Sequence, residues 1–189
     1  MKFIKKHSYE ITRLIIYQAG MSVFGLILTF ASIMSRKASQ NPLTLVAGIF
    51  ASCFYLYLIY AVTWDMGAKD KIRIDAGRQE KDNFLGLKLI AAAQIPNGIV
   101  VLVMWLGAII CLGNNGLGNM LFGIGHPISI FTQGMYLGII TQFLPNESMV
   151  FNSAIYSIAV IPSLFAGSFG YFFGIKDIRF LTSPYVPKK

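Results

Sequence analysis

The stretch LIAAAQIPNGIVVLVMWLGAIICL, Leu89–Leu112, decides the fold class because it contains no Asp, Glu, Lys or Arg. A helix crosses the roughly 30 Å hydrocarbon core of a bilayer with about 20 apolar residues. The stretch is long enough for one such crossing. Buried helices of soluble proteins seldom run this far without a charge. It therefore predicts a membrane-spanning helix.

Three further stretches have the same character: Leu14–Met34, Leu43–Thr63 and Val150–Phe173. In the whole chain of 189 residues, 55% are hydrophobic and 13% are charged, against about 25% charged in an average soluble domain. This composition excludes an ordinary soluble enzyme domain, a disordered chain and a disulfide-stapled secreted module. We expect an all-α integral membrane protein, with residues 1–189 forming a single membrane domain built as a four-transmembrane-helix bundle.

The basic residues predict the orientation of the spans. If both termini are cytoplasmic, Arg36 and Lys37 are the only two of the 16 Lys and Arg residues that lie outside. The loop 65–88 is then cytoplasmic. A basic inner face against anionic lipid also accounts for the net charge of +8, so nucleic acid is not an expected partner. We expect a multi-pass protein of a bacterial cell membrane, with the lipid bilayer as its first partner.

The outer segment 113–147 carries no charge before Glu147, yet it is not a clean span. The residues 117–144 are too few for two crossings and are interrupted by glycines and Pro127. A single crossing would place the basic C-terminal end outside, against the charge rule. We expect an interfacial helix that caps the bundle or a re-entrant dip, and a fifth span is the alternative that the charge rule disfavours.

The segments at the inner ends of the second and fourth predicted spans, which we call the helix exits, resemble each other. The sequences WDMGAKDKIRI at 64–74 and FGIKDIRF at 173–180 both contain Gly, then Lys-Asp, then Ile-Arg. If the similarity reflects duplication, the protein consists of two parallel two-helix repeats related by an axis along the membrane normal. Chance is the competing interpretation, because the ends of membrane helices are alike in composition.

Polar side chains and prolines within the apolar stretches are the candidates for a binding site. Pro96 and Pro162 each remove a backbone donor and predict a kink in their helix. Amides in such surroundings either join helices or line a cavity for a small uncharged or amphipathic ligand. The candidate ligand-lining amides are Gln94, Asn97, Gln133 and Gln142.

The charged residues next to the inner helix ends alternate in sign. A solvated helix face is one interpretation, and a docking surface for a partner is the other. The candidate docking residues are Lys69, Asp70, Arg73, Lys176, Asp177 and Arg179.

The sequence contains no set of residues typical of catalysis. No ionisable carboxylate or amine lies within a predicted span, and neither metal-ligand spacing nor a phosphate-binding loop occurs. We expect no catalytic residues, no metal and no cofactor. The favoured function is a non-catalytic membrane subunit or ligand-binding module of a transport complex, which contacts another membrane or cytoplasmic subunit. The alternatives are a homo-oligomeric channel or uniporter with Leu117–Leu144 as pore or lid and, less favoured, an intramembrane enzyme that uses His126.

Overall fold

The computed structural model describes residues 2–35, 42–78, 80, 82, 84–113, 116–143 and 148–178. Every regular element within these ranges is helical, which confirms the expected all-α class. Three helical stretches, Ser8–Ser35, Pro42–Asp75 and Met149–Ile175, are long and apolar enough to cross a membrane, and a bent helix pair makes a fourth if it counts as one span. These helices are consistent with the expected integral membrane protein.

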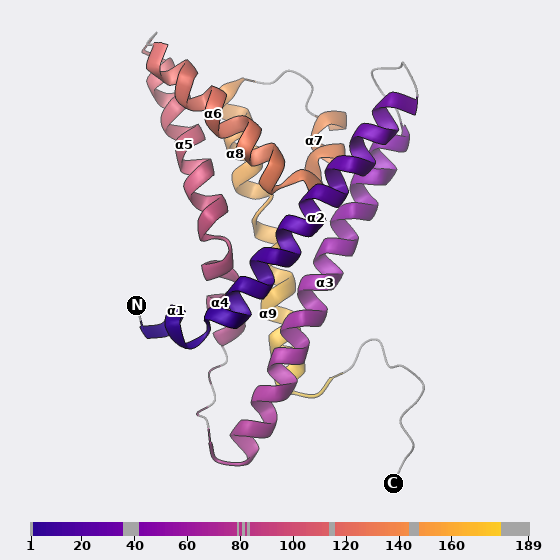
Figure 1. Ribbon diagram of the computed structural model, residues 1–189, viewed down its shortest axis with the longest axis vertical. Coiled ribbons are helices and arrows are strands. Elements are labelled where there is room, and N and C mark those ends of the chain that lie inside the picture. Colours follow the sequence, from indigo (N-terminus) through magenta and orange to yellow (C-terminus); the bar gives the residue numbers. More distant parts are fainter. Residues whose placement is uncertain are drawn as a thin grey trace.

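The N-terminal half is a long helical hairpin (Figure 1). A short helix α1 (Lys2–Lys6) precedes α2 (Ser8–Ser35), and α3 (Pro42–Asp75) packs against α2. Helix α3 starts with a proline, which fits the first helical position because that residue needs no N–H partner. It continues well beyond its apolar part, so the first half of the predicted cytoplasmic loop is helical. The ion pair of Lys69 with Asp65, at 2.7 Å and one turn apart, supports that continuation.

The other two apolar stretches are interrupted helices. Helices α4 (Leu85–Ala93) and α5 (Ile95–Cys111) meet at Gln94 with a bend of 53°. Helices α8 (Met149–Ile158) and α9 (Ile161–Ile175) are separated at 159–160. A proline follows each break, at the second position of the next helix, because a proline cannot donate to the preceding turn.

The start of α4 is held by Asp82. One of its carboxylate oxygens accepts a hydrogen bond from the backbone N–H of Phe84 at 3.0 Å, and the other accepts one from Lys88 at 2.6 Å. The hydrogen bond from Lys88 is the main cause that lowers the pKa of Asp82 below its ordinary value. These contacts fix where the chain turns back from α3 towards the helix breaks.

The segment between α5 and α8 forms a helical hairpin, which we call the inserted hairpin. It consists of α6 (Gly116–Thr132), the 3₁₀ turn η1 (Gly134–Tyr136) and α7 (Leu137–Phe143). In Figure 1, α6 runs from the end of α5 towards the middle of the molecule and α7 runs back. Pro127 does not interrupt α6, and the chain turns at Gln133 instead. The described part of this segment therefore enters the bundle rather than lying across its end.

Glycines allow the inserted hairpin to approach its neighbours closely. A Cβ added to Gly48 of α3 would lie 2.6 Å from the backbone nitrogen of Ile139, and one added to Gly138 would lie 2.6 Å from the carbonyl oxygen of Thr44. A Cβ on Gly107 of α5 would lie 2.5 Å from the backbone nitrogen of Phe122. Such contacts between backbones are typical of membrane helix pairs.

Helices α3 and α9 make a reciprocal contact. A Cβ on Gly67 would overlap the carbonyl oxygen of Tyr171, and a Cβ on Gly174 would overlap the carbonyl oxygen of Trp64. The two glycines also face each other, and each meets the aromatic residue that lies three positions before the other glycine. Such a reciprocal arrangement is what a two-fold relation between two surfaces produces.

We expect Gly67→Ala to destabilise the protein by about 1–3 kcal/mol, because the new methyl group meets backbone that can move only with its helix. Gly20→Ala is the matched control, since a Cβ there meets nothing within 4 Å. Its stability should be equal or higher, because alanine favours a helix over glycine. Thermal unfolding in a mild detergent measures both, and equal melting temperatures would contradict the contact.

Candidate ligand site at the helix breaks

Gln94, the residue between α4 and α5, joins four helices. Its Nε2 donates to the Tyr55 hydroxyl at 3.2 Å and to Ser163 Oγ at 2.9 Å. Its Oε1 accepts from Gln18 Nε2 at 3.3 Å and from Asn97 Nδ2 at 2.7 Å. All the hydrogen-bonding positions of this buried carboxamide are thereby filled. We call these five residues the Gln94 network.

The network brings the two helix breaks together. Gln94 lies in the first break, and Ser163 lies in the first turn after the second break. Ser163 Oγ also donates to the carbonyl oxygen of Val160 at 2.7 Å, a residue of the second break. Polar backbone exposed by an interrupted helix needs such partners in apolar surroundings. The hydrogen bonds that link Gln94 to Ser163 and Ser163 to Val160 provide such a partner.

The turn of the inserted hairpin lies beside the network. Ser22 of α2 donates to the carbonyl oxygen of Phe131 and accepts from the N–H of Gly134, both at 2.6 Å. Ser52 of α3 donates to the carbonyl oxygen of Met135 at 3.0 Å. Hydroxyl groups of α2 and α3 therefore hold the hairpin turn on both sides.

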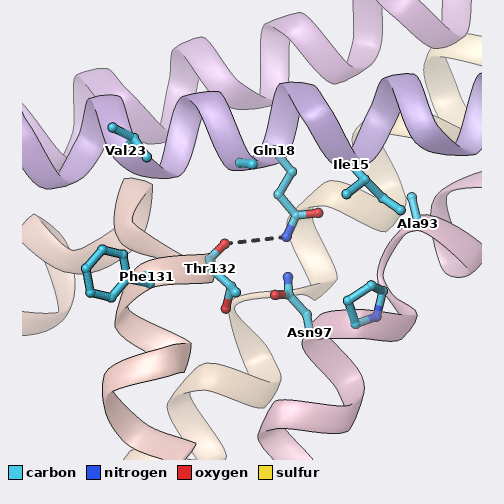
Figure 2. Close-up of a pocket in the computed structure, with 9 residues that line it drawn as sticks. Ile15, Gln18, Val23, Ala93, Asn97, Phe131 and Thr132 are labelled. Carbon is cyan, nitrogen blue, oxygen red and sulfur yellow. Dashed lines mark hydrogen bonds between the residues drawn. The ribbon is translucent and has the colours of Figure 1, made fainter.

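A pocket of about 150 Å³ opens beside these elements (Figure 2). Carboxamides line it from two sides, Gln18 from α2 and Asn97 from α5, and Gln18 Nε2 lies 3.5 Å from the carbonyl oxygen of Thr132. At its rim, Val23 is 50% exposed and Phe131 is 67% exposed. The nine lining residues are Ile15, Gln18, Ala19, Val23, Ala93, Pro96, Asn97, Phe131 and Thr132. The pocket is thus an apolar recess with amide groups, open on the side of the bundle.

The hairpin turn also carries buried polar groups without partners. Within the described ranges, neither the Nε2 nor the Oε1 atom of the Gln133 side chain forms a hydrogen bond, although the residue is only 1% exposed. The hydroxyl of Tyr136 is likewise unpaired, and its ring packs edge-on against Tyr55 with centroids 6.1 Å apart. Each buried unpaired polar group costs about 1–3 kcal/mol.

The structure separates the four predicted ligand-lining amides. Gln94 and Asn97 share a hydrogen bond, but of the four only Asn97 is among the lining residues of the pocket. Gln133 is buried in the hairpin turn. Gln142 is partly exposed on α7 and makes no hydrogen bond to the others in the described part of the chain. Sequence reasoning missed Gln18 as a site residue, although it is the only carboxamide in the first apolar stretch.

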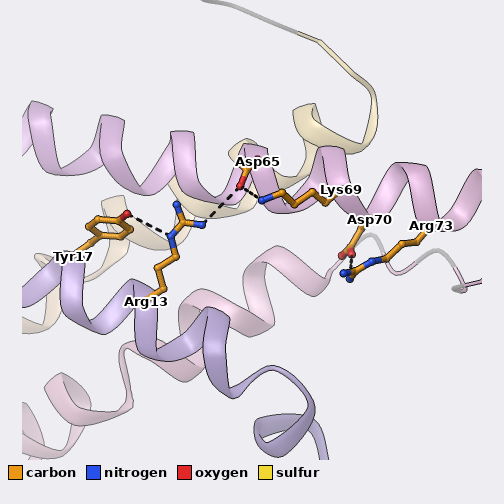
Figure 3. Close-up of polar contacts among 6 residues, drawn as sticks. All are labelled: Arg13, Tyr17, Asp65, Lys69, Asp70 and Arg73. Carbon is orange, nitrogen blue, oxygen red and sulfur yellow. Dashed lines mark hydrogen bonds and ion pairs between the residues drawn. The ribbon is translucent and has the colours of Figure 1, made fainter.

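The predicted docking residues also differ from one another in exposure and in their contacts, as Figure 3 shows for those on α3. Lys69 and Arg73 have exposed side chains, at 61% and 60%, although each is paired with an aspartate of α3. Asp70 is buried and accepts a hydrogen bond from the Tyr171 hydroxyl at 2.9 Å, so it joins α3 to α9. Lys176 lies over the ring of Phe172, 4.2 Å from its centroid. Asp177 lies two residues after the end of α9 with a positive φ of 53°, and Arg179 lies outside the described residues.

A second recess lies among these charges. Arg13 of α2 reaches Asp65 of α3 at 3.7 Å, and its Nε donates to the hydroxyl of Tyr17 at 3.4 Å. The recess measures about 230 Å³ and has both acidic and basic lining residues, among them Glu10. Because these charges are paired across α2 and α3, the arrangement connects the two helix ends.

His126 does not form a catalytic pair within the described ranges. Its ring stacks on Phe122 at 5.4 Å and meets Tyr156 edge-on at 5.8 Å. The same ranges contain no group of three or more His, Cys, Asp or Glu residues that could hold a metal ion.

No family model, no curated protein and no solved structure matches this chain.

We expect Gln94→Leu to destabilise the protein by about 2 kcal/mol, since it removes four hydrogen bonds that average about 0.6 kcal/mol each between membrane helices. Gln142→Leu is the matched control, because that amide lies outside the network, and should change stability by less than about 0.5 kcal/mol. Unfolding in detergent tests both variants. Equal losses would show that the network does not stabilise the fold.

Proposed function

We propose that the protein is a non-catalytic, multi-pass membrane protein that serves as the ligand-binding module or membrane subunit of a transport complex. The observation that carries the proposal is the Gln94 network, where two helix breaks and the hairpin turn meet beside a pocket. In many transporters, substrate sites near the bilayer midplane are formed by discontinuous helices. Irregular backbone at that depth is tolerated where protein buries it or a cavity adjoins it.

The proposal includes a topology. Four spans, namely α2, α3, the bent pair α4–α5 and the pair α8–α9, place both termini in the cytoplasm of a bacterial cell. The inserted hairpin is then re-entrant from the outer side. Its turn contacts Ser22, which lies near the middle of α2, and this depth favours a re-entrant dip over an interfacial cap.

The proposal also includes an internal duplication. The reciprocal contacts of Gly67 with Tyr171 and of Gly174 with Trp64 support two parallel two-helix repeats, because each glycine meets the aromatic residue three positions before the other glycine. In this arrangement α2–α3 corresponds to α4–α5 with α8–α9, and the inserted hairpin is an insertion in the second copy.

The alternative function is a self-sufficient homo-oligomeric channel or uniporter. The unpaired polar groups of Gln133 and Tyr136 favour it, because water or a permeating solute could pair with them if the hairpin turn lined a path. An intramembrane enzyme based on His126 has less support, since the contacts of that imidazole are with the rings of Phe122 and Tyr156.

The first experiment is extraction in a mild detergent, followed by measurement of the mass and composition of the particle. We expect a second subunit to co-purify. A particle of this chain alone that conducts solutes in liposomes would support the channel instead, and one without flux would leave a stand-alone binding protein.

If the inner surface docks that subunit, the double variant Lys69→Gln/Arg73→Gln should reduce co-purification at least tenfold, because it removes two exposed positive charges. Lys5→Gln is the matched control, since Lys5 is an exposed lysine of α1 outside the proposed surface. Quantitative mass spectrometry of the purified particles gives the ratio. Undiminished capture by the double variant would exclude this surface.

A further inference from the structure

We propose that the pocket between α2, α5 and α6 binds a small, uncharged molecule with a hydroxyl group, of about the size of phenol. This inference rests on the proposed function, because it names the ligand class of the same site. Three properties of the pocket support this inference: the absence of charge in its lining, the unused hydrogen-bond acceptors of its carboxamides, and its volume.

The lining favours a neutral ligand. None of the nine lining residues has an ionisable side chain, and most are aliphatic or aromatic. An ion moved from water into such a recess would lose its hydration without gaining an opposite charge, and the penalty amounts to several kcal/mol. A carboxylate or an ammonium group is therefore a poor ligand for this pocket.

The carboxamides favour a hydrogen-bond donor. Both Gln18 and Asn97 direct their NH₂ groups towards Gln94 Oε1, which leaves their own carbonyl oxygens as acceptors. Within the described chain, neither Gln18 Oε1 nor Asn97 Oδ1 accepts a hydrogen bond, and both side chains line the pocket (Figure 2). A hydroxyl group on the ligand would supply the missing donor.

The volume limits the size of the bound part. An engineered cavity of about 150 Å³ in another protein holds one benzene molecule. The present pocket, also about 150 Å³, accommodates one six-membered ring with a small substituent. Its rim residues Val23 and Phe131 are exposed on the side of the bundle, which allows access from the bilayer, where neutral aromatic molecules accumulate.

The test uses three fluorinated probes with the purified protein in lipid nanodiscs at pH 7. The probe 4-fluorophenol is neutral and has a hydroxyl group, fluorobenzene lacks the hydroxyl group, and 4-fluorobenzoate is charged. Titrations followed by ¹⁹F NMR should show saturable binding of 4-fluorophenol. We expect fluorobenzene to bind about tenfold more weakly, and 4-fluorobenzoate to show no saturable binding.

Variants locate the bound probe. Val23→Trp places an indole at the rim from an exposed position and should abolish saturable binding. Ile27→Trp is the matched control, one turn along α2, similarly exposed and outside the pocket lining, and should bind normally. Asn97→Leu removes one acceptor and should weaken 4-fluorophenol binding about tenfold without weakening fluorobenzene binding.

Several results would overturn the inference: no saturable binding of 4-fluorophenol, equal or tighter binding of 4-fluorobenzoate, or normal binding by Val23→Trp. The proposed function is judged separately, by co-purification and flux. A protein that co-purifies with a partner but does not bind 4-fluorophenol would retain the function and lose this ligand class. A protein that binds 4-fluorophenol but has neither partner nor flux would support this ligand class and contradict the proposed function.

Discussion

Burying a carboxamide among helices is costly unless its polar atoms find partners, and Gln94 finds them on four different helices. The requirement arises because an unpaired amide in apolar surroundings costs more free energy than a single hydrogen bond contributes. The position of Gln94 between α4 and α5 therefore fixes the relative placement of α2, α3 and α9. The helix break and the network depend on each other, since a continuous helix would not present its residues in the same directions.

Close backbone contacts are the second condition for this arrangement. The inserted hairpin fits between α2, α3 and α5 because glycines face it or lie on it at each of these contacts, among them Gly25, Gly48 and Gly107. Larger residues would force the hairpin outwards and move its turn away from Ser22. The hydroxyl groups that hold the turn act at short range, so they depend on the glycines for their geometry.

The sequence predicted the helical class and the four apolar stretches, because charge-free length is a local property. It did not predict the convergence of Gln18, Tyr55 and Ser163 on Gln94, whose partners lie 39 to 76 residues away. Such pairings depend on how the helices pack, and a single sequence carries no direct signal of it. The segment 113–147, which has no charge before Glu147, was compatible with a cap as well as with a dip, since both need the same composition. The sequence suggested an interruption between Gly123 and Pro127, whereas α6 continues through these residues and the chain turns at Gln133.

The location of the pocket connects binding to the conformation of the hairpin. Its lining includes Gln18 and Asn97 of the network as well as Phe131 and Thr132 at the end of α6. A molecule bound there would contact both the fixed part of the bundle and the segment that glycine contacts hold in place. A ligand shifts a conformational equilibrium only by its difference in affinity for the two states. Because the hairpin supplies part of the lining, any displacement of its turn changes the pocket. Binding of the proposed ligand there would therefore be energetically coupled to the position of the hairpin.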